Sequence, residues 1–157
     1  MWPFSSAPTV YTGKLLSADE VRSQLGAGYL TTLGKAQYAE VNSAAVIWLA
    51  QQTQSALFSV APHWEPDATC TLFAATGVSV AGQKFAGQAF SDKISETLCA
   101  LAFGEVWFHP DSDPTSGHAI NFALTEKGVL HIDPQAPNAL RPMSANEIAG
   151  RYFLRLL

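Results

Sequence analysis

Apolar side chains recur at three- and four-residue steps between residues 36 and 58, a period that is typical of one face of a helix. Polar residues of this segment fall mostly on the other side. We therefore predict the longest helix of the chain here and interpret its aromatic residues as core packing. The residues on the predicted buried face are Tyr38, Val41, Ala45, Trp48, Leu49, Gln52 and Ala56.

Two four-residue segments have the sequence of a capping box, in which Ser and Glu side chains accept hydrogen bonds from backbone amides at a helix start. The first, SADE at 17–20, predicts a short helix that ends near Leu25, because Gly26 follows it. The second, SANE at 144–147, predicts another short helix.

A third short helix is predicted after the loop at 62–67, which has a proline near each end. It begins at about Cys70 and ends at Gly77, since glycine commonly terminates helices. Residues 78–95 stay unassigned, because two further glycines interrupt any long element there.

The second half of the chain is rich in strand-forming residues. Residues 98–108 predict a strand, with Gly104 as a bulge. Two apolar segments, 118–124 and 129–133, flank the turn sequence TEKG and predict a β-hairpin. Residues 152–156 are expected to complete the sheet.

These elements predict one α+β domain, in which N-terminal helices pack on a small antiparallel sheet. A chain of 157 residues is long enough for one domain with its own core. Residues 1–16, which include two prolines, are predicted to form an irregular arm, and residues 17–157 the domain.

The composition argues against several classes of protein. The chain is 48% hydrophobic and 14% charged, which is too apolar for a disordered chain. Its net charge is −4 and its 9 basic residues are not clustered, so we expect no nucleic-acid partner. No apolar run approaches the roughly 20 residues of a membrane-spanning helix. The first residues lack the pattern of a secretory signal, so we expect a cytoplasmic or virion-associated protein.

Cysteine chemistry is the clearest candidate for a function. A cysteine is a nucleophile as the thiolate, which a helix N-terminus and a neighbouring imidazolium both stabilise. Cys70 stands where a helix is predicted to begin, and a backbone amide there also suits an oxyanion. Cys99 lies among apolar residues and is interpreted as a small core side chain, so we expect no disulfide.

The predicted base is His118, with Asp133 as its partner. A turn near 126–127 places the two residues almost directly opposite each other across the hairpin. A carboxylate there can fix the tautomer of the imidazole and stabilise its charged form. Gln135 adds a polar contact, and Asn121 is a weaker candidate for the same neighbourhood. The spacing alone leaves both a catalytic pair and a purely structural surface pair open.

The hairpin also resembles a known family. The sequences GHAIN at 117–121 and GVLHIDPQ at 128–135 resemble papain-like domains, in which a His-Ala-x-Asn strand is followed by a strand ending in Glu-Pro-Gln. These domains include the C-terminal domain of a mushroom agglutinin and related phage proteins; papain-fold toxins of the glutamine-deamidase kind are similar. Their order of cysteine, histidine and acid matches Cys70, His118 and Asp133.

The sequence around the cysteine departs from that pattern. The agglutinin-type pattern surrounds its cysteine with aspartates, some of which bind a divalent metal, whereas this chain has TCTLFA at 69–74. We therefore expect no metal and no cofactor, and we interpret Asp67, Asp111 and Asp113 as solvated loop residues. The glutamine that precedes a papain-type nucleophile is also missing, and Trp64 stands roughly in its place.

The resemblance implies one of two functions. The first is a papain-like cysteine hydrolase that uses the Cys-His-Asp triad, with Gln135 beside it, on a peptide or glutamine amide of a protein substrate. The second is a catalytically inactive module of the same fold, cytoplasmic or virion-associated, that acts as a structural or interaction protein. In that case the apolar arm with Trp2 and Phe4 would bind a protein partner.

Overall fold

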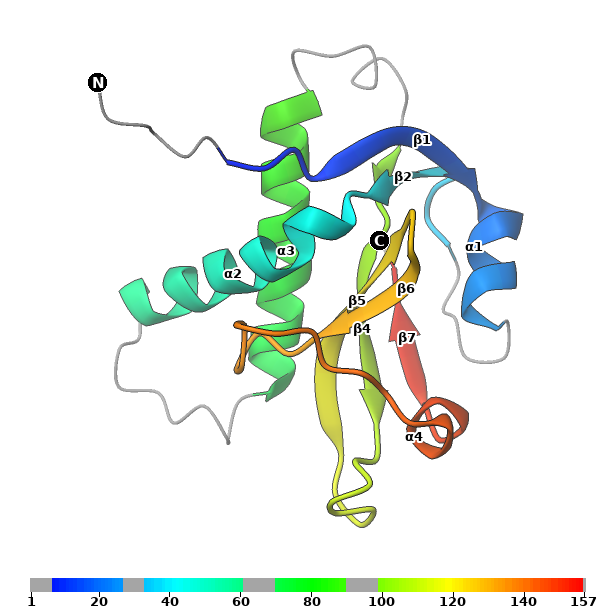
Figure 1. The fold of residues 1–157 in the computed structure, drawn as a ribbon, viewed down its shortest axis with the longest axis vertical. Coiled ribbons are helices and arrows are strands. Elements are labelled where there is room, and N and C mark those ends of the chain that lie inside the picture. The colour runs from blue at the N-terminus through cyan, green and yellow to red at the C-terminus, as the bar shows by residue number, and fades with distance from the viewer. Residues whose placement is uncertain (1–6, 27–32, 61–69, 90–98, 157) are drawn as a thin grey trace.

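The computed structural model describes residues 7–26, 33–60, 70–89 and 99–156. These residues fold as an α+β domain with a seven-stranded sheet and four α-helices (Figure 1). The strands are β1 (Tyr11–Ser17), β2 (Gln37–Val41), β3 (Ala100–Leu101), β4 (Phe103–Phe108), β5 (His118–Thr125), β6 (Gly128–Ile132) and β7 (Phe153–Arg155). The helices are α1 (Ala18–Leu25), α2 (Val46–Val60), α3 (Cys70–Ala89) and α4 (Ala145–Ala149), and a 3-10 turn, η2 (Ser43–Ala45), precedes α2.

The sheet is built around β5, which pairs antiparallel with both β4 and β6. β7 pairs antiparallel with the other side of β4, and β1 and β2 form a further antiparallel pair. β2 joins the rest through parallel contacts with β3 and with Thr125 at the end of β5. The expected antiparallel sheet is therefore correct for most pairs, and the sheet is mixed where β2 meets its neighbours.

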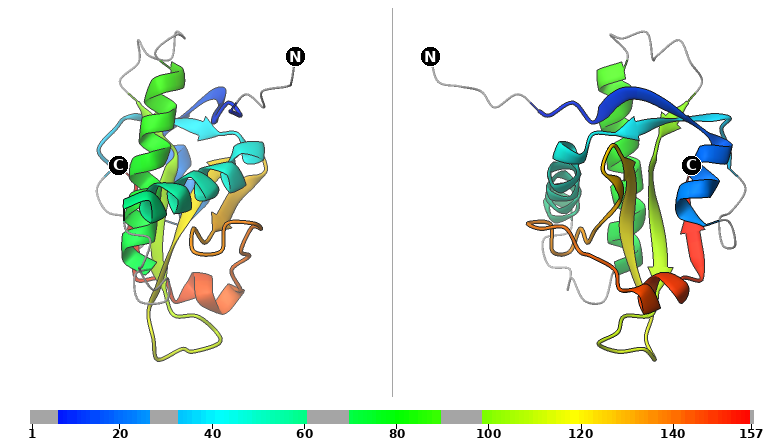
Figure 2. Two further views of the ribbon diagram at one scale, coloured as in Figure 1. Left: turned by 90° about the vertical axis from the view of Figure 1, so that its left-hand side faces the viewer. Right: turned by 45° about the vertical axis from the view of Figure 1, so that its right-hand side comes forward.

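Helices α2 and α3 form a layer beside the sheet (Figure 2). α3 packs along β4 and β5, and α2 packs against α3 and β6. α1 lies with β1 and β2, at the opposite side of the molecule from α2 (Figure 1). The largest side chains with no exposed surface are Tyr38, Phe73, Phe108 and Phe122. Tyr38, Phe108 and Phe122 belong to one core that joins the helices to the sheet.

The predicted N-terminal arm is, in its described part, mainly a strand. Residues 11–16 belong to β1, which pairs with β2 and completely buries Val10 and Leu16 beside it. The strand forms because these apolar side chains reach the core only when the segment lies along β2. Residues 1–6 of the predicted arm lie outside the described residues.

The helix predicted from residue 36 begins only at Val46. Residues 37–41 form β2, in which Tyr38, Ala39 and Val41 are all buried. A strand that is buried on both faces shows no alternation, so its apolar residues can match the period of a helix face. The predicted helix is confirmed from Val46 onward, whereas residues 43–45 form the 3-10 turn η2.

α3 is much longer than the predicted helix. It continues through Gly77 to Ala89, across residues left unassigned. Glycine lowers helix stability by about 1 kcal/mol at each position, and burial of one face of α3 outweighs that cost. None of the helices in the described ranges has the length and apolar character needed to cross a membrane.

Of the remaining local predictions, the capping boxes, the hairpin and the last strand are confirmed, and the bulge at Gly104 is wrong. Both capping boxes form, at the starts of α1 and α4. The hairpin of β5 and β6 has its turn at 126–127, and β7 completes the sheet. Gly104 is not a bulge: it pairs regularly with Phe122, and a Cβ there would overlap the Phe122 ring and the Arg155 carbonyl oxygen.

Candidate active site

The sequence DPQ at 133–135 forms a tight turn directly after β6. The Asp133 carbonyl oxygen accepts a hydrogen bond from the Ala136 amide at 2.9 Å, and Pro134 takes the position where its fixed φ suits such a turn. The Asp133 Oδ1 accepts a second hydrogen bond from the Gln135 amide, also at 2.9 Å. This local bond fixes the carboxylate and leaves Oδ2 for a partner elsewhere.

His118, the first residue of β5, is that partner. Its Nε2 lies 2.7 Å from Asp133 Oδ2, and the two side chains are 23% and 14% exposed. A carboxylate oxygen can only accept, so Nε2 carries the proton. Nδ1 is then the ring nitrogen that can accept a proton from a nucleophile.

The register of the hairpin differs from the predicted one. The ladder of β5 and β6 ends with Asn121 opposite Ile132. Continued by three residues, it would place Gln135 opposite His118, so Asp133 lies diagonally, two positions away on the same face. The predicted contact therefore forms, although through a diagonal pair rather than a directly opposed one.

Two aromatic side chains support the start of β5. Phe108 pairs with His118 in the ladder, and their rings meet edge to face with centroids 5.8 Å apart. The Tyr152 hydroxyl lies so close to Gly117 that a Cβ there would overlap it. Glycine before the histidine thus allows Tyr152 to pack directly against the backbone that positions the imidazole.

Asn121 contacts α3 rather than the imidazole. It is 1% exposed, and its Nδ2 donates to the Ala74 carbonyl oxygen on α3 at 2.8 Å and to the Gly104 carbonyl oxygen on β4 at 3.1 Å. Side chains alternate along a strand, so Asn121 and His118 face opposite sides of β5. Its predicted place in the neighbourhood of His118 is therefore wrong, and its contacts tie the first turns of α3 to the sheet.

Cys70 is the first residue of α3, one helical turn before Ala74. Its thiol is half-buried and forms no disulfide. The beginning of α3 and the beginning of β5 lie at the same end of the sheet in both views (Figures 1 and 2). Among the described residues, no hydrogen bond joins Cys70 to His118 or Asp133, so the structure brings together the histidine and the acid and leaves the cysteine as a neighbour at that end.

Gln135, within this turn, contacts Gln54 on α2. Its carbonyl oxygen accepts a long hydrogen bond of 3.4 Å from Gln54 Nε2. Its own Nε2 is buried and has no partner within the described part of the chain. A buried donor without an acceptor is costly, and it suits a position that the acceptor of a bound molecule completes.

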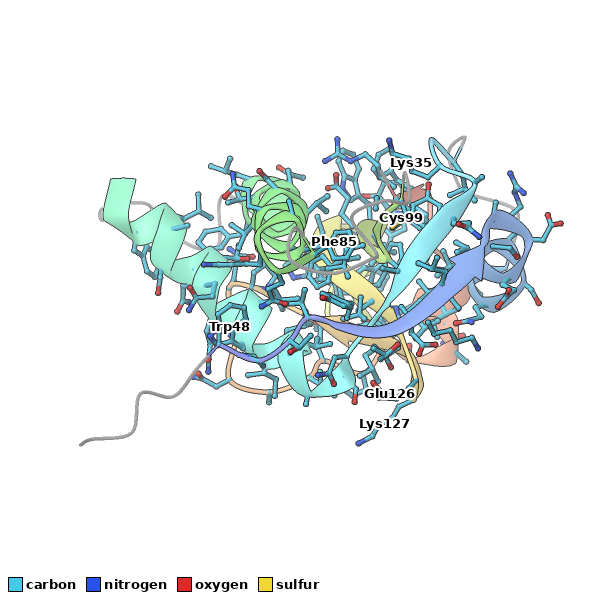
Figure 3. The ribbon with its side chains drawn as sticks, turned by 90° about the horizontal axis from the view of Figure 1, so that it is seen from above. Lys35, Trp48, Phe85, Cys99, Glu126 and Lys127 are labelled. Carbon is cyan, nitrogen blue, oxygen red and sulfur yellow. The ribbon has the colours of Figure 1, made fainter. Side chains whose placement is uncertain are left out.

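Cys99 lies beside Lys35 (Figure 3), directly before β3. Burial raises the pKa of its thiol, and the charge of Lys35 partly opposes that rise. The side chain packs against the core, as expected of a small apolar residue. A thiol with a raised pKa is largely protonated at neutral pH, so Cys99 is a poor nucleophile.

The loop at 109–117 holds a turn. The Asp113 carboxylate accepts hydrogen bonds from the hydroxyl and the amide of Thr115, which lowers the pKa of Asp113. Asp67 and Trp64 lie outside the described residues. Within the described ranges, no three His, Cys, Asp or Glu side chains gather where they could hold a metal ion.

A buried ion pair beside the site was not predicted. Arg141 Nη1 and Nη2 donate to the two carboxylate oxygens of Glu147 at 3.0 and 2.9 Å. These bonds lower the pKa of Glu147 to about 2, and the carboxylate is 4% exposed. The capping box identifies Glu147 as a helix-start residue, but no local pattern pairs it with Arg141.

His131 lies on β6, two residues before Asp133. Burial, together with the charges of Arg151 and Arg141, lowers the pKa of His131 to about 4, so the ring is neutral at pH 7. It lines a cavity of about 450 Å³ whose other walls are mainly apolar: Val129, Leu130, Leu140, Arg141, Pro142, Met143 and Ile148.

Comparisons with known proteins find a similar fold among solved structures. No protein-family model matches the sequence, and no curated protein matches it. Among solved structures, the chain is similar to one titled "PSL1a-E64 complex", with a TM-score of 0.61 and 18% sequence identity. The match covers 90% of this chain and 51% of that one, so this chain spans about half the length of that structure. At this identity the likeness concerns the fold alone.

Proposed function

We propose that this chain is a cysteine-dependent hydrolase of papain-like fold, with Cys70 as nucleophile, His118 as base and Asp133 as the residue that orients the base. The 2.7 Å hydrogen bond between His118 Nε2 and Asp133 Oδ2 carries the proposal, because it leaves Nδ1 to take the proton of a thiol. The substrate is an amide, either a peptide bond or the side chain of a glutamine in a protein.

The reaction passes through a thioester. Cys70 gives its proton to His118 Nδ1, and the thiolate attacks the carbonyl carbon of the amide. His118 then returns the proton to the leaving nitrogen as the carbon–nitrogen bond breaks. A water molecule, deprotonated by His118, attacks the thioester, releases the acid and restores the Cys70 thiol.

The start of α3 supports a thiolate and an oxyanion. Backbone amides at a helix N-terminus lack partners within the helix and favour negative charge. Asn121 holds the first turns of α3 against β4 and β5. Gln135 Nε2, buried without a partner among the described residues, adds a donor for a substrate carbonyl. Catalytic hydrogen bonds often tighten only when substrate binds, so the thiol and the ring need not be bonded beforehand.

The similar structure adds support through its title. E64 is an inhibitor of cysteine proteases, and the protein of that structure is described as its complex. The likeness in fold, at a TM-score of 0.61, supports a papain-like framework for this chain. The papain-like class and the activity are carried to this chain as parts of the proposal.

Selective alkylation of the cysteines tests the proposal. The chain is treated with iodoacetamide at mildly acidic pH, and modification is located by mass spectrometry. Cys70 is expected to react much faster than Cys99, whose raised pKa keeps it protonated. The variant His118→Ala is expected to lose this preference. In the unaltered chain, E64 is expected to form an adduct at Cys70 only. Equal labelling of the two cysteines in the unaltered chain would count against the proposal.

A catalytically inactive module is the second candidate. The observation that favours it is the missing hydrogen bond between Cys70 and His118. The predicted binding arm could then consist only of the residues before Ala7, since residues 11–16 lie in the sheet. Size-exclusion chromatography of the full chain and of a chain beginning at Ala7 tests this role; an unchanged monomer in both would remove its support.

A further inference from the structure

The buried carboxylate of Glu147 joins three segments of the chain. Besides the two bonds from Arg141, it accepts hydrogen bonds from the Ser144 amide at 3.1 Å and from the Asp111 amide at 3.1 Å. Asp111 belongs to the loop that leads into His118. Arg141 belongs to the segment that follows the Asp133 turn. One carboxylate therefore fixes both the chain before the imidazole and the chain after its acid.

Arg141 itself bridges two strands on either side of β5. Its amide donates to the His131 carbonyl oxygen on β6 at 2.9 Å. Its guanidinium lies over the Phe108 ring on β4, with 4.8 Å from its central carbon to the ring centroid. Phe108 in turn meets the His118 ring edge to face at 5.8 Å. Arg141 thus contacts the neighbours of both His118 and Asp133 from the face of the sheet on which that pair lies.

From this arrangement we infer that Arg141, held in place by Glu147, is a positioning residue for the pair of His118 and Asp133. Arg141 keeps Phe108 packed against the imidazole and keeps the end of β6 in place, so that Oδ2 of Asp133 stays within hydrogen-bonding distance of Nε2. The inference rests on the proposed function for its consequence in catalysis, whereas the geometry it explains is independent of that function.

The charges of this assembly fit that role. Glu147 stays ionised at neutral pH and compensates the guanidinium through two parallel bonds. A forked guanidinium can satisfy both oxygens of Glu147 and still lie flat on an aromatic ring, which a lysine ammonium cannot do. The identity of the residue is therefore expected to matter beyond its charge.

The variants Arg141→Gln and Arg141→Lys test the inference, with Arg155→Gln as a matched control. Arg155 also pairs with a buried glutamate, Glu105, at 2.7 Å, with side-chain exposures of 36% and 4% against 29% and 5% for Arg141 and Glu147. Glu105 is three residues from Phe108 on β4 and so faces the other side of the sheet. The variant Arg155→Gln therefore removes a similar ion pair that does not lie on the His118 side of the sheet.

Two quantities are measured for each protein at the same interval below its own melting temperature. The first is the ¹⁵N NMR signature of the His118 imidazole, which reports whether Nε2 carries the proton. The second is the rate of Cys70 alkylation. Arg141→Gln is expected to mix the two tautomers and to slow alkylation by about tenfold or more, since small misplacements of a base are costly. Arg155→Gln is expected to leave both readouts unchanged.

The outcomes separate this inference from the proposed function. If Cys70 is unreactive in the unaltered chain, then the proposed function fails. The NMR signature of His118 still tests whether Arg141 positions the imidazole. If Arg141→Gln fails to fold, then Arg141→Lys tests the positioning role, because lysine keeps the charge but loses the forked contact with Glu147. The unaltered imidazole signature in a folded Arg141 variant, or the same change in Arg155→Gln, would overturn the inference.

Discussion

Asn121 on β5 and Gly77 on α3 lie in direct contact, with no room for a methyl group between them. A Cβ on Gly77 would overlap the side-chain oxygen of Asn121, whose amide nitrogen is bonded to Ala74 one turn earlier in the helix. The close approach lets a single buried amide bridge α3 and β4 across β5. This contact explains why a residue that commonly ends helices is found within one.

Replacing Gly77 by alanine is expected to destabilise the fold by about 1–3 kcal/mol, because overpacking outweighs the better helix propensity of alanine. Gly82 is the matched control on the same helix: it is exposed, and nothing lies within 4 Å of a Cβ placed there. Gly82→Ala is expected to stabilise by up to about 1 kcal/mol. Urea unfolding of both variants measures the difference, and changes of the same sign would contradict this account.

The neutral ring of His131 predicts a loss of stability in acid. Its pKa is about 4 in the folded chain and 6.5 in the unfolded one, so between these values the unfolded chain binds the additional proton. Stability is therefore complete above about pH 6.5 and falls as the pH drops toward 4, by up to about 3 kcal/mol. Urea unfolding between pH 7 and 4 measures the slope.

His131→Gln is the control for this slope, because glutamine does not titrate. The variant is expected to differ from the unaltered chain in its stability at pH 7, through lost packing, and to show a flatter dependence on pH. Parallel curves for the two proteins would mean that His131 does not cause the acid sensitivity.

The lowered pKa of Glu147 predicts a second loss of stability, at a more acidic pH than that caused by His131. Its pKa is about 2 in the folded chain and 4.5 in the unfolded one, so its contribution is present above pH 4.5 and is lost as the pH falls toward 2. Glu147→Gln breaks a buried pair and is expected to cost about 3–5 kcal/mol at pH 7. The gap between the two proteins should narrow by about 2 kcal/mol between pH 5 and pH 3. If urea unfolding shows a constant difference in stability between the two proteins over this pH range, then the partners of Glu147 do not lower its pKa.

Features that depend on neighbouring residues were predictable from the sequence. Ser17 and Ser144 cap their helices through residues three positions away, and the turn at 126–127 closes the hairpin. The contact between His118 and Asp133 belongs to the same class, since a short hairpin brings its two ends together. Only its register was wrong, because β5 is buried on both faces and its apolar pattern therefore does not select one register.

Features that depend on distant residues were not predictable. Tyr38 matches a helical period, and its pairing with β1 and β3 makes it part of a strand. α3 contains three glycines that intrinsic propensity disfavours by about 3 kcal/mol in total, and packing against Asn121 and the sheet overcomes them. The capping box identifies Glu147 alone, whereas its bonds from Arg141 and the contact of Arg141 with Phe108, far away in the sequence, have no local signal.

The two hydrogen bonds of Asp133 make its amide variant a sharp test of the site. Oδ1 accepts from the Gln135 amide and Oδ2 from His118 Nε2, so both oxygens are needed as acceptors. Asparagine has one acceptor oxygen, and the rigid turn favours its use by Gln135. The asparagine NH₂ group then faces His118 and donates to Nε2, which moves the ring proton to Nδ1.

A protonated Nδ1 cannot accept a proton from Cys70. Asp133→Asn is therefore expected to slow Cys70 alkylation by about 10²–10⁴-fold, the range expected when a catalytic histidine is held in the wrong tautomer. Asp133→Ala leaves the ring without a directing partner and is expected to be less severe, although it also weakens the turn. The ¹⁵N signals of His118 should show the Nδ1-protonated form in the asparagine variant and a mixture in the alanine variant. If the asparagine variant keeps the Nε2-protonated ring and reacts at the unaltered rate, then Asp133 does not direct the base.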